Sequence, residues 1–84
     1  MKPETGYCVC KNGKLLIKVN ETAGKDHNVD VSMHCPAGKP VALVHTHNVN
    51  PNPSPQDLQT SKDKKITVCI DFKGQGKVRC YKGV

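Results

Sequence analysis

Two histidines and an aspartate near the middle of the chain are of the types that bind zinc. His45 and His47 end an apolar run, 41–44, and Asp57 follows ten residues after the second histidine. If that run is a strand, the side-chain period of two puts both imidazoles on one face. Three protein ligands with an open fourth position are the usual arrangement of a catalytic zinc. The sequence therefore predicts a metal site at these three residues.

The same residues also have a purely structural interpretation. Ser54 is suited to cap a helix, Pro55 suits the first helical position, and Asp57 stands where a capping-box acid belongs. Histidines on a strand can equally be solvated surface residues. The combination of paired histidines at a strand end with an acid at the start of the next helix favours the metal site. The strand, the short loop 48–53 and the start of the helix would bring the acid next to both imidazoles.

The elements that must position these residues are those of a small α+β domain. Alternating apolar residues and turn signals predict one domain, 1–84, with a mixed or antiparallel sheet and one main helix after the histidine strand. The expected strands are 6–10, 14–19, 28–34, 40–47, 66–72 and 77–81, and the expected helix is 55–63. The Asn12-Gly13 pair predicts the first hairpin turn. The run 41–44 indicates a strand buried on both faces.

The composition predicts a small core that needs additional support. Only 36% of the 84 residues are hydrophobic and tryptophan is absent, so a metal, disulfides or a partner chain is expected. The five cysteines lack a Cys-x-x-Cys pair, which argues against a structural zinc ribbon, and their odd number leaves at least one thiol free or intermolecular. A turn at Gly74-Gln75 would place Cys69 opposite Cys80.

The remaining cysteine, charge and terminal features bear on compartment and partners. Disulfides would indicate a secreted protein or the cytosol of a hyperthermophile, and small buried hydrophobes are the alternative. The N-terminus is not a signal peptide, which favours the cytoplasm. The net charge of +6 comes from dispersed lysines among two tyrosines and one phenylalanine, a pattern that favours a solvated face over nucleic acid. No apolar run is long enough to span a membrane.

The central motif resembles the signature of the JAMM/MPN (JAB-domain) zinc metalloproteases. That signature is an upstream glutamate, then His-x-His, a spacer and Ser-x-x-Asp; the matching residues here are His45-Thr46-His47 and Ser54-Pro55-Gln56-Asp57. The resemblance covers roughly 4–81. It implies a sheet flanked by helices, as in that family. This chain would be a minimal member, because only three residues precede Glu4 where the family has a helix. Asn48 stands where proline is usual, and the spacer is one residue shorter.

The resemblance also implies a role for each matching residue. The implied ligands of one Zn²⁺ per chain are His45, His47 and Asp57. Ser54 would stabilise the oxyanion, and Glu4, in the context Glu4-Thr5-Gly6, would be the general base, with Glu21 as the fallback. The implied activity is hydrolysis of a peptide or isopeptide bond in a protein or peptide substrate, ubiquitin-like proteins included. An oligomer or a partner chain would cover the exposed face of the sheet.

Two other functions are compatible with the sequence. The first is a catalytically inactive binding or scaffold module of the same fold. The second is a small, basic, disulfide-stapled protein that binds an acidic partner. The position of Glu4 relative to the histidines separates the peptidase from the scaffold, and metal content separates both from the stapled binding protein.

Overall fold

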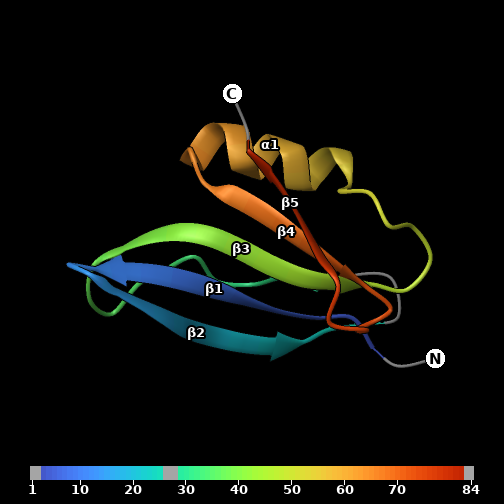
Figure 1. Cartoon of the computed structure of the whole chain (residues 1–84), viewed down its shortest axis with the longest axis horizontal. Helices are drawn as coiled ribbons and strands as arrows, with labels where there is room; N and C mark the ends of the chain where they lie inside the picture. The colour runs from blue at the N-terminus through green and yellow to red at the C-terminus, as the bar shows by residue number, and fades with distance from the viewer. Residues whose placement is uncertain (1–2, 26–28, 83–84) are drawn as a thin grey trace.

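The computed structural model describes residues 3–25 and 29–82, and its five strands form one mixed sheet (Figure 1). The strands are β1 (Thr5–Asn12), β2 (Leu15–Ala23), β3 (Lys39–His47), β4 (Thr67–Phe72) and β5 (Val78–Lys82), and the helix is α1 (Pro55–Lys64). The strand order is β2-β1-β3-β4-β5. Only β3 and β4 are parallel, and α1 connects them. The expected small α+β architecture with one helix is thereby confirmed.

The first hairpin turns one residue later than the sequence indicates. Asn12 pairs with Leu15, so the two turn residues are Gly13 and Lys14 rather than Asn12 and Gly13. Gly13 has a φ of 62°, a conformation that glycine adopts without steric cost. The glycine therefore takes the first turn position, and the flanking asparagine remains in the strand.

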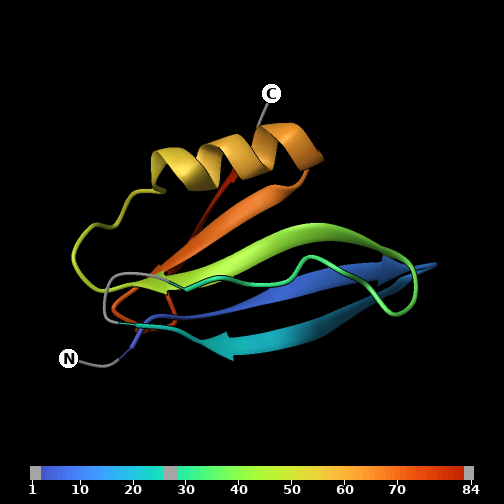
Figure 2. The same cartoon turned by 180° about the vertical axis from the view of Figure 1, so that it is seen from behind.

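The expected strand 28–34 is wrong over 29–34, and residue 28 lies outside the described residues. This segment crosses one face of the sheet instead of joining its edge (Figure 2). Side chains attach it there: Asn20 Nδ2 donates to the carbonyls of Ser32 and His34, at 2.8 Å each. Val31 and Met33 point into the core. The alternation of apolar residues was therefore a real signal of one-sided burial, but the neighbours are side chains and not another strand's backbone.

One face of the sheet, here called the front face, holds the core. Leu43, Val68 and Ile70 come from β3 and β4 and pack with Ile66 beneath α1. On the opposite face, Ala42 and Val44 are only half-buried. The expected burial of β3 on both faces is therefore wrong, because within the described residues α1 and segment 29–36 both lie on the front face.

Two disulfides cross-link elements of the fold. Cys69 pairs directly with Cys80 across β4 and β5, which confirms the register expected for that hairpin, and the two are bonded. Cys10 of β1 is bonded to Cys35, which attaches segment 29–36 to the front face. Cys8 is the free cysteine and is buried. No described helix is long and apolar enough to cross a membrane.

Candidate metal centre

The two histidines lie side by side on the front face of β3. His45 pairs with Gly6 of β1 and Ile70 of β4, so it sits in the middle of the sheet. The two imidazole centroids are 5.1 Å apart. Both residues are buried, with exposed fractions of 7% and 9%. The period-two prediction for this strand is confirmed.

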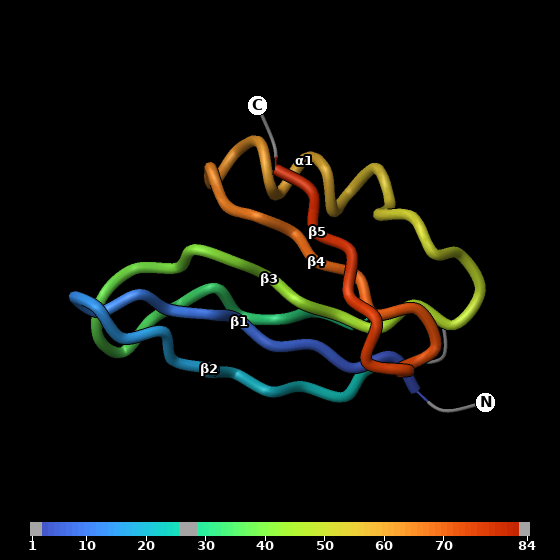
Figure 3. Tube along the Cα trace, in the orientation of Figure 1, coloured from blue at the N-terminus to red at the C-terminus, as the bar shows by residue number. Residues whose placement is uncertain are grey.

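The start of α1 brings the acid to the histidines. The loop 48–53 leaves the end of β3 and returns over the sheet into the helix (Figure 3). Ser54 caps the helix: its Oγ accepts from the Asp57 N–H at 3.1 Å, and its own N–H donates to Asp57 Oδ2 at 2.8 Å. This capping box is the one expected from the sequence. It holds the carboxylate in a fixed orientation toward β3.

The carboxylate contacts both imidazoles. Asp57 Oδ1 lies 2.9 Å from His45 Nε2, and Oδ2 lies 3.3 Å from His47 Nε2. One ligand atom from each of the three residues lies within 4.8 Å of the others. The capping interpretation and the metal interpretation of Asp57 are therefore compatible, since the same side chain satisfies the geometry of both.

The tautomer of His47 follows from its neighbours. Its Nδ1 lies 3.1 Å from the carbonyl oxygen of Asn50 and 3.0 Å from that of Asn52. Carbonyl oxygens only accept, so Nδ1 must carry the hydrogen, and in the neutral ring Nε2 then presents a lone pair. That lone pair faces the Asp57 carboxylate. Two electron-rich atoms at this distance require a proton or a metal cation between them.

His45 gives an independent indication of a cation-binding site. Both of its ring nitrogens are buried, and neither makes a hydrogen bond to any described residue. Nε2 lies 2.9 Å from Asp57 Oδ1, the distance of an ion pair when the ring is protonated, but the contact does not meet the geometric criteria of a hydrogen bond. Buried polar atoms are rarely left unpaired. A metal ion bound by His45, His47 and Asp57 would satisfy Nε2 of His45. This donor set fits zinc with an open position.

Asp57 is ionised over the whole physiological pH range. Burial raises the pKa of its carboxyl group, but the His45 contact and the Ser54 N–H and hydroxyl outweigh it, and the net pKa falls to about 2. A carboxylate is the form that binds a metal. The His45 contact and the cap together therefore keep the Asp57 carboxyl group ionised.

Glu4 lies in the same groove as the histidines. Gly6 pairs with His45, and Glu4 stands two residues before Gly6. Because side chains alternate along a strand, Glu4 returns to the front face, near His47. Glu4 is 8% exposed, and its backbone is anchored by the Gly24 N–H at 2.8 Å. A groove of about 690 Å³ is lined by Glu4, both histidines, Ser54 and Asp57. The five residues expected to form a site are thus brought together.

Glu21, the fallback for the base, is elsewhere. It is exposed on β2 and forms an ion pair with Lys18 at 2.6 Å. Glu21 lines a different groove, whose other lining residues include Tyr7 and Lys18. Glu21 is therefore not available to the groove that holds the imidazoles.

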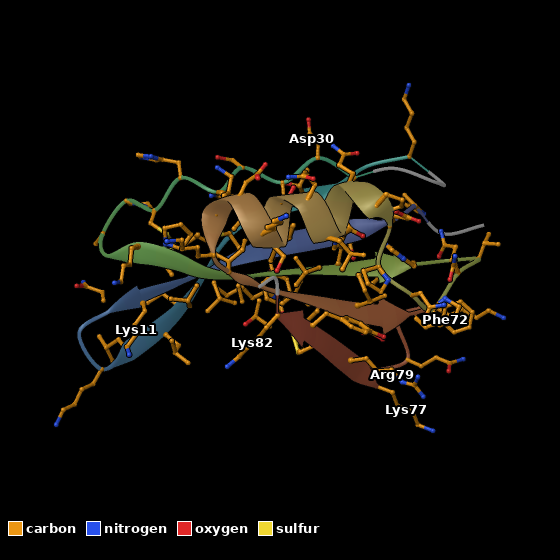
Figure 4. All side chains as sticks on the ribbon, turned by 90° about the horizontal axis from the view of Figure 1, so that it is seen from above. Lys11, Asp30, Phe72, Lys77, Arg79 and Lys82 are labelled. Carbon is orange, nitrogen blue, oxygen red and sulfur yellow. A yellow bond between two sulfur atoms is a disulfide. The ribbon has the colours of Figure 1, made fainter. Side chains whose placement is uncertain are left out.

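Several features of the site have no signal in the sequence. The carbonyl groups that orient His47 belong to the loop backbone, where residue type predicts little. Asp30 and Val31 form one wall of the groove because segment 29–36 crosses the sheet. No lysine or arginine is among the described residues that line the groove, although the chain carries 13. Figure 4 shows Asp30 on one side of α1 and Lys77, Arg79 and Lys82 on the other.

Comparisons of the chain with protein-family models, with curated proteins and with solved structures find no match. The resemblance to the JAMM/MPN metalloproteases therefore depends on the His-x-His and Ser-x-x-Asp residues and their spacing.

Proposed function

We propose that this protein is a zinc-dependent peptidase or isopeptidase of the JAMM type. The observation that carries the proposal is the convergence of two imidazole Nε2 atoms on one buried carboxylate, with the His47 lone pair facing that carboxylate. A structural capping box explains Ser54 and Asp57 but gives Nε2 of His45, which faces the carboxylate, no hydrogen bond. A cation at this position accounts for all three side chains.

The surrounding groups support hydrolysis as the reaction. Bound zinc supplies a Lewis acid that makes water nucleophilic near neutral pH and polarises a carbonyl oxygen. Glu4 and Asp30 are the carboxylates in the groove that are not proposed ligands. Glu4 is buried and lies on the same face as His47, whereas Asp30 is exposed, so Glu4 is the proposed base. It takes the proton of the attacking water and passes it to the departing amine.

Ser54 can serve the oxyanion while it caps the helix. Its oxygen accepts from the Asp57 N–H, which leaves the hydroxyl hydrogen for another acceptor. If the hydroxyl donates this hydrogen to the oxygen of a carbonyl under attack, the hydrogen bond stabilises the developing negative charge where water is excluded. The two roles use different parts of the hydroxyl group.

Zinc content of the purified full chain tests the site. We expect one zinc per chain in the wild type, and less than about a tenth of that in His47→Ala after dialysis against a weak chelator, because one of three ligands is lost. His34→Ala is the matched control, since His34 is exposed and outside the groove. Metal is measured by elemental mass spectrometry. Stoichiometric zinc in His47→Ala would remove the basis of the proposal.

Glu4→Gln tests the reaction separately from the metal. We expect the variant to keep its zinc and to lose hydrolysis by about a hundredfold or more, because the amide cannot accept the proton. Activity is followed on a panel of peptide and isopeptide substrates, ubiquitin conjugates included. Glu21→Gln is the control and should retain wild-type activity, because Glu21 lies outside the groove. Equal rates for Glu4→Gln and wild type would exclude Glu4 as the base. Zinc binding without cleavage of any substrate would favour the binding-module alternative.

A further inference from the structure

Three sulfur atoms gather on the front face of β1, apart from the proposed zinc ligands. Cys8 and Cys10 are two residues apart on the strand, with exposed fractions of 0% and 1%. Cys10 is bonded to Cys35, and the free sulfur of Cys8 lies 4.0 Å from that of Cys10. All three sulfurs lie within 4.8 Å of one another. A free thiol is thus held beside a disulfide in the core of the protein.

We propose that Cys8, Cys10 and Cys35 form a thiol–disulfide exchange site, in which Cys8 displaces Cys35 from Cys10. The Cys8 thiol loses its proton, and the thiolate forms a bond to Cys10 Sγ. The bond between Cys10 and Cys35 breaks, and its electron pair leaves with Cys35 Sγ, which then takes up a proton. One thiol and one disulfide exist before and after the step, so it needs neither oxidant nor reductant.

The product requires a local bend of β1. Two residues of an extended strand span about 6.6 Å between Cα atoms, at the upper end of the range of about 4.4–6.8 Å that disulfides bridge, and the strand must bend at Val9 to bring the two Cβ atoms within about 4.5 Å. β1 is irregular here: its pairing with β2 shifts between Gly6 and Cys8, and its pairing with β3 shifts between Val9 and Cys10, within the pair. Such irregularities bend a strand and bring neighbouring side chains into new orientations. A Cys8–Cys10 disulfide therefore requires a local adjustment and no refolding of the sheet.

Burial sets the direction and the pace of the exchange. Burial raises the pKa of the Cys8 thiol, so little thiolate is present at neutral pH and the exchange is slow. Cys35 is half-buried, whereas Cys8 and Cys10 are buried. The released sulfur is therefore the one that water reaches most easily, which stabilises it as a leaving thiolate.

The exchange would release a wall of the groove. Cys35 is the covalent attachment of segment 29–36, and Asp30 and Val31 of that segment line the groove with the histidines. After exchange, the segment is held by the Asn20 hydrogen bonds and by the packing of Val31 and Met33. Any effect of this release on hydrolysis rests on the proposed function, but the exchange itself does not.

Thiol trapping in the full chain tests the exchange without zinc or substrate. The native, non-reduced protein is incubated at mildly alkaline pH with N-ethylmaleimide, then digested with trypsin and mapped by mass spectrometry. Lys11 and Lys25 separate the peptide that contains both Cys8 and Cys10 from that of Cys35. We expect the label to accumulate on Cys35 while Cys8 and Cys10 become internally bridged. The Cys69–Cys80 disulfide is the internal reference and stays intact.

Two variants make the test decisive. In Cys8→Ser, or in Cys8→Ala if the serine is not tolerated at this buried position, Cys35 labelling should be slower by about tenfold or more, because no internal thiol can displace it. In Cys35→Ser, oxidised glutathione should drive formation of a Cys8–Cys10 bridge, which tests the product geometry directly.

Three results would overturn the proposal. The first is label on Cys8 with the Cys10–Cys35 disulfide intact, which would mean simple exposure of the thiol. The second is label on Cys10 with a Cys8–Cys35 bridge, which would keep the segment attached. The third is equal labelling of Cys35 in wild type and in the Cys8 variants. A zinc-free protein that gives the expected labelling would leave the exchange standing and remove only the proposed function.

Discussion

At the scale of single residues, Asp57 connects the helix to the strand. Its Oδ2 accepts the Ser54 N–H, and both of its oxygens approach imidazole nitrogens. A residue needed only as a cap could point to solvent, whereas this carboxylate is 6% exposed. The energetic cost of burying a charge is offset by the contacts it makes. Asp57 is therefore the residue at which the stability of the fold and the proposed metal binding are coupled.

The lowered pKa of Asp57 predicts a specific acid sensitivity of the zinc-free protein. With a folded pKa of about 2 against an ordinary pKa of 3.8 for an aspartate, the ionised carboxylate stabilises the fold above pH 3.8, and this contribution is lost as the pH falls through about 2. We expect the free energy of unfolding of wild type to exceed that of Asp57→Asn by an amount that shrinks by about 2 kcal/mol across this window. Urea denaturation at a series of pH values measures it.

Asp63→Asn is the matched control for this acid sensitivity. Asp63 is on the same helix but is exposed, where it accepts from Gln59 Nε2. The difference in free energy of unfolding between Asp63→Asn and wild type should stay nearly constant over the same pH range. Parallel curves for Asp57→Asn and wild type would contradict the assignment of a buried, stabilised carboxylate.

At the scale of elements, the site lies where the parallel pair β3 and β4 is connected through α1. The chain leaves the carboxyl end of β3 and returns at the N-terminus of α1, so the last residues of the strand face the first turn of the helix. The third contributor is β1, whose Gly6 lies opposite His45. The site therefore requires close approach of β1, β3 and segment 29–36.

Gly6 is the residue that permits this approach. A Cβ added there would lie 2.6 Å from Val31 Cγ2, 3.1 Å from the Val44 carbonyl oxygen and 3.2 Å from His45 Cβ. We expect Gly6→Ala to reduce the free energy of unfolding by about 1–3 kcal/mol, since overpacking forces neighbours to move. It should also weaken zinc binding, because His45 is one of those neighbours. Urea denaturation and competitive zinc titration measure the two effects.

Gly13→Asn is the control for the loss of a glycine. A Cβ at Gly13 meets nothing within 4 Å, and asparagine tolerates its positive φ better than other residues. It should leave zinc affinity unchanged. Wild-type zinc affinity in Gly6→Ala would show that the packing of β1 against β3 does not position His45.

At the scale of the whole molecule, covalent bonds and the proposed metal compensate for a small core. The buried apolar cluster consists of Leu43, Ile66, Val68 and Ile70. One disulfide closes the last hairpin, and the other attaches segment 29–36 to β1. The zinc site would join β3 to α1 in the same way. Small domains commonly rely on such cross-links.

Zinc should therefore stabilise the whole fold and not only the site. A ligand that binds the folded state alone stabilises it by about 2.7 kcal/mol at a free concentration one hundred times its Kd. We expect the Tm of wild type to rise with zinc and to fall again with a chelator, as measured by calorimetry. His47→Ala should show no zinc-dependent rise, and His34→Ala should respond as wild type does. A Tm of wild type that is independent of zinc would contradict binding to the folded state.

The sequence by itself determined the features that depend on neighbouring residues. The period of two in β3 determined that His45 and His47 share a face, and the cap residues determined where α1 begins, because both are local properties of the backbone. The cross-strand pairing of Cys69 and Cys80 was accessible for the same reason, since a short hairpin connects them.

Only the tertiary structure decided the features that depend on distant contacts. It laid segment 29–36 across the sheet and bonded Cys10 to Cys35. It also brought Glu4 to the histidine face and left Glu21 outside. The pairing of strands that are distant in the sequence and the path of a long loop depend on packing over the whole chain, which local residue types and spacing do not specify. The shared face of His45 and His47 was thus predictable from the residues of β3 itself, whereas the residues that surround the two histidines followed from the tertiary structure.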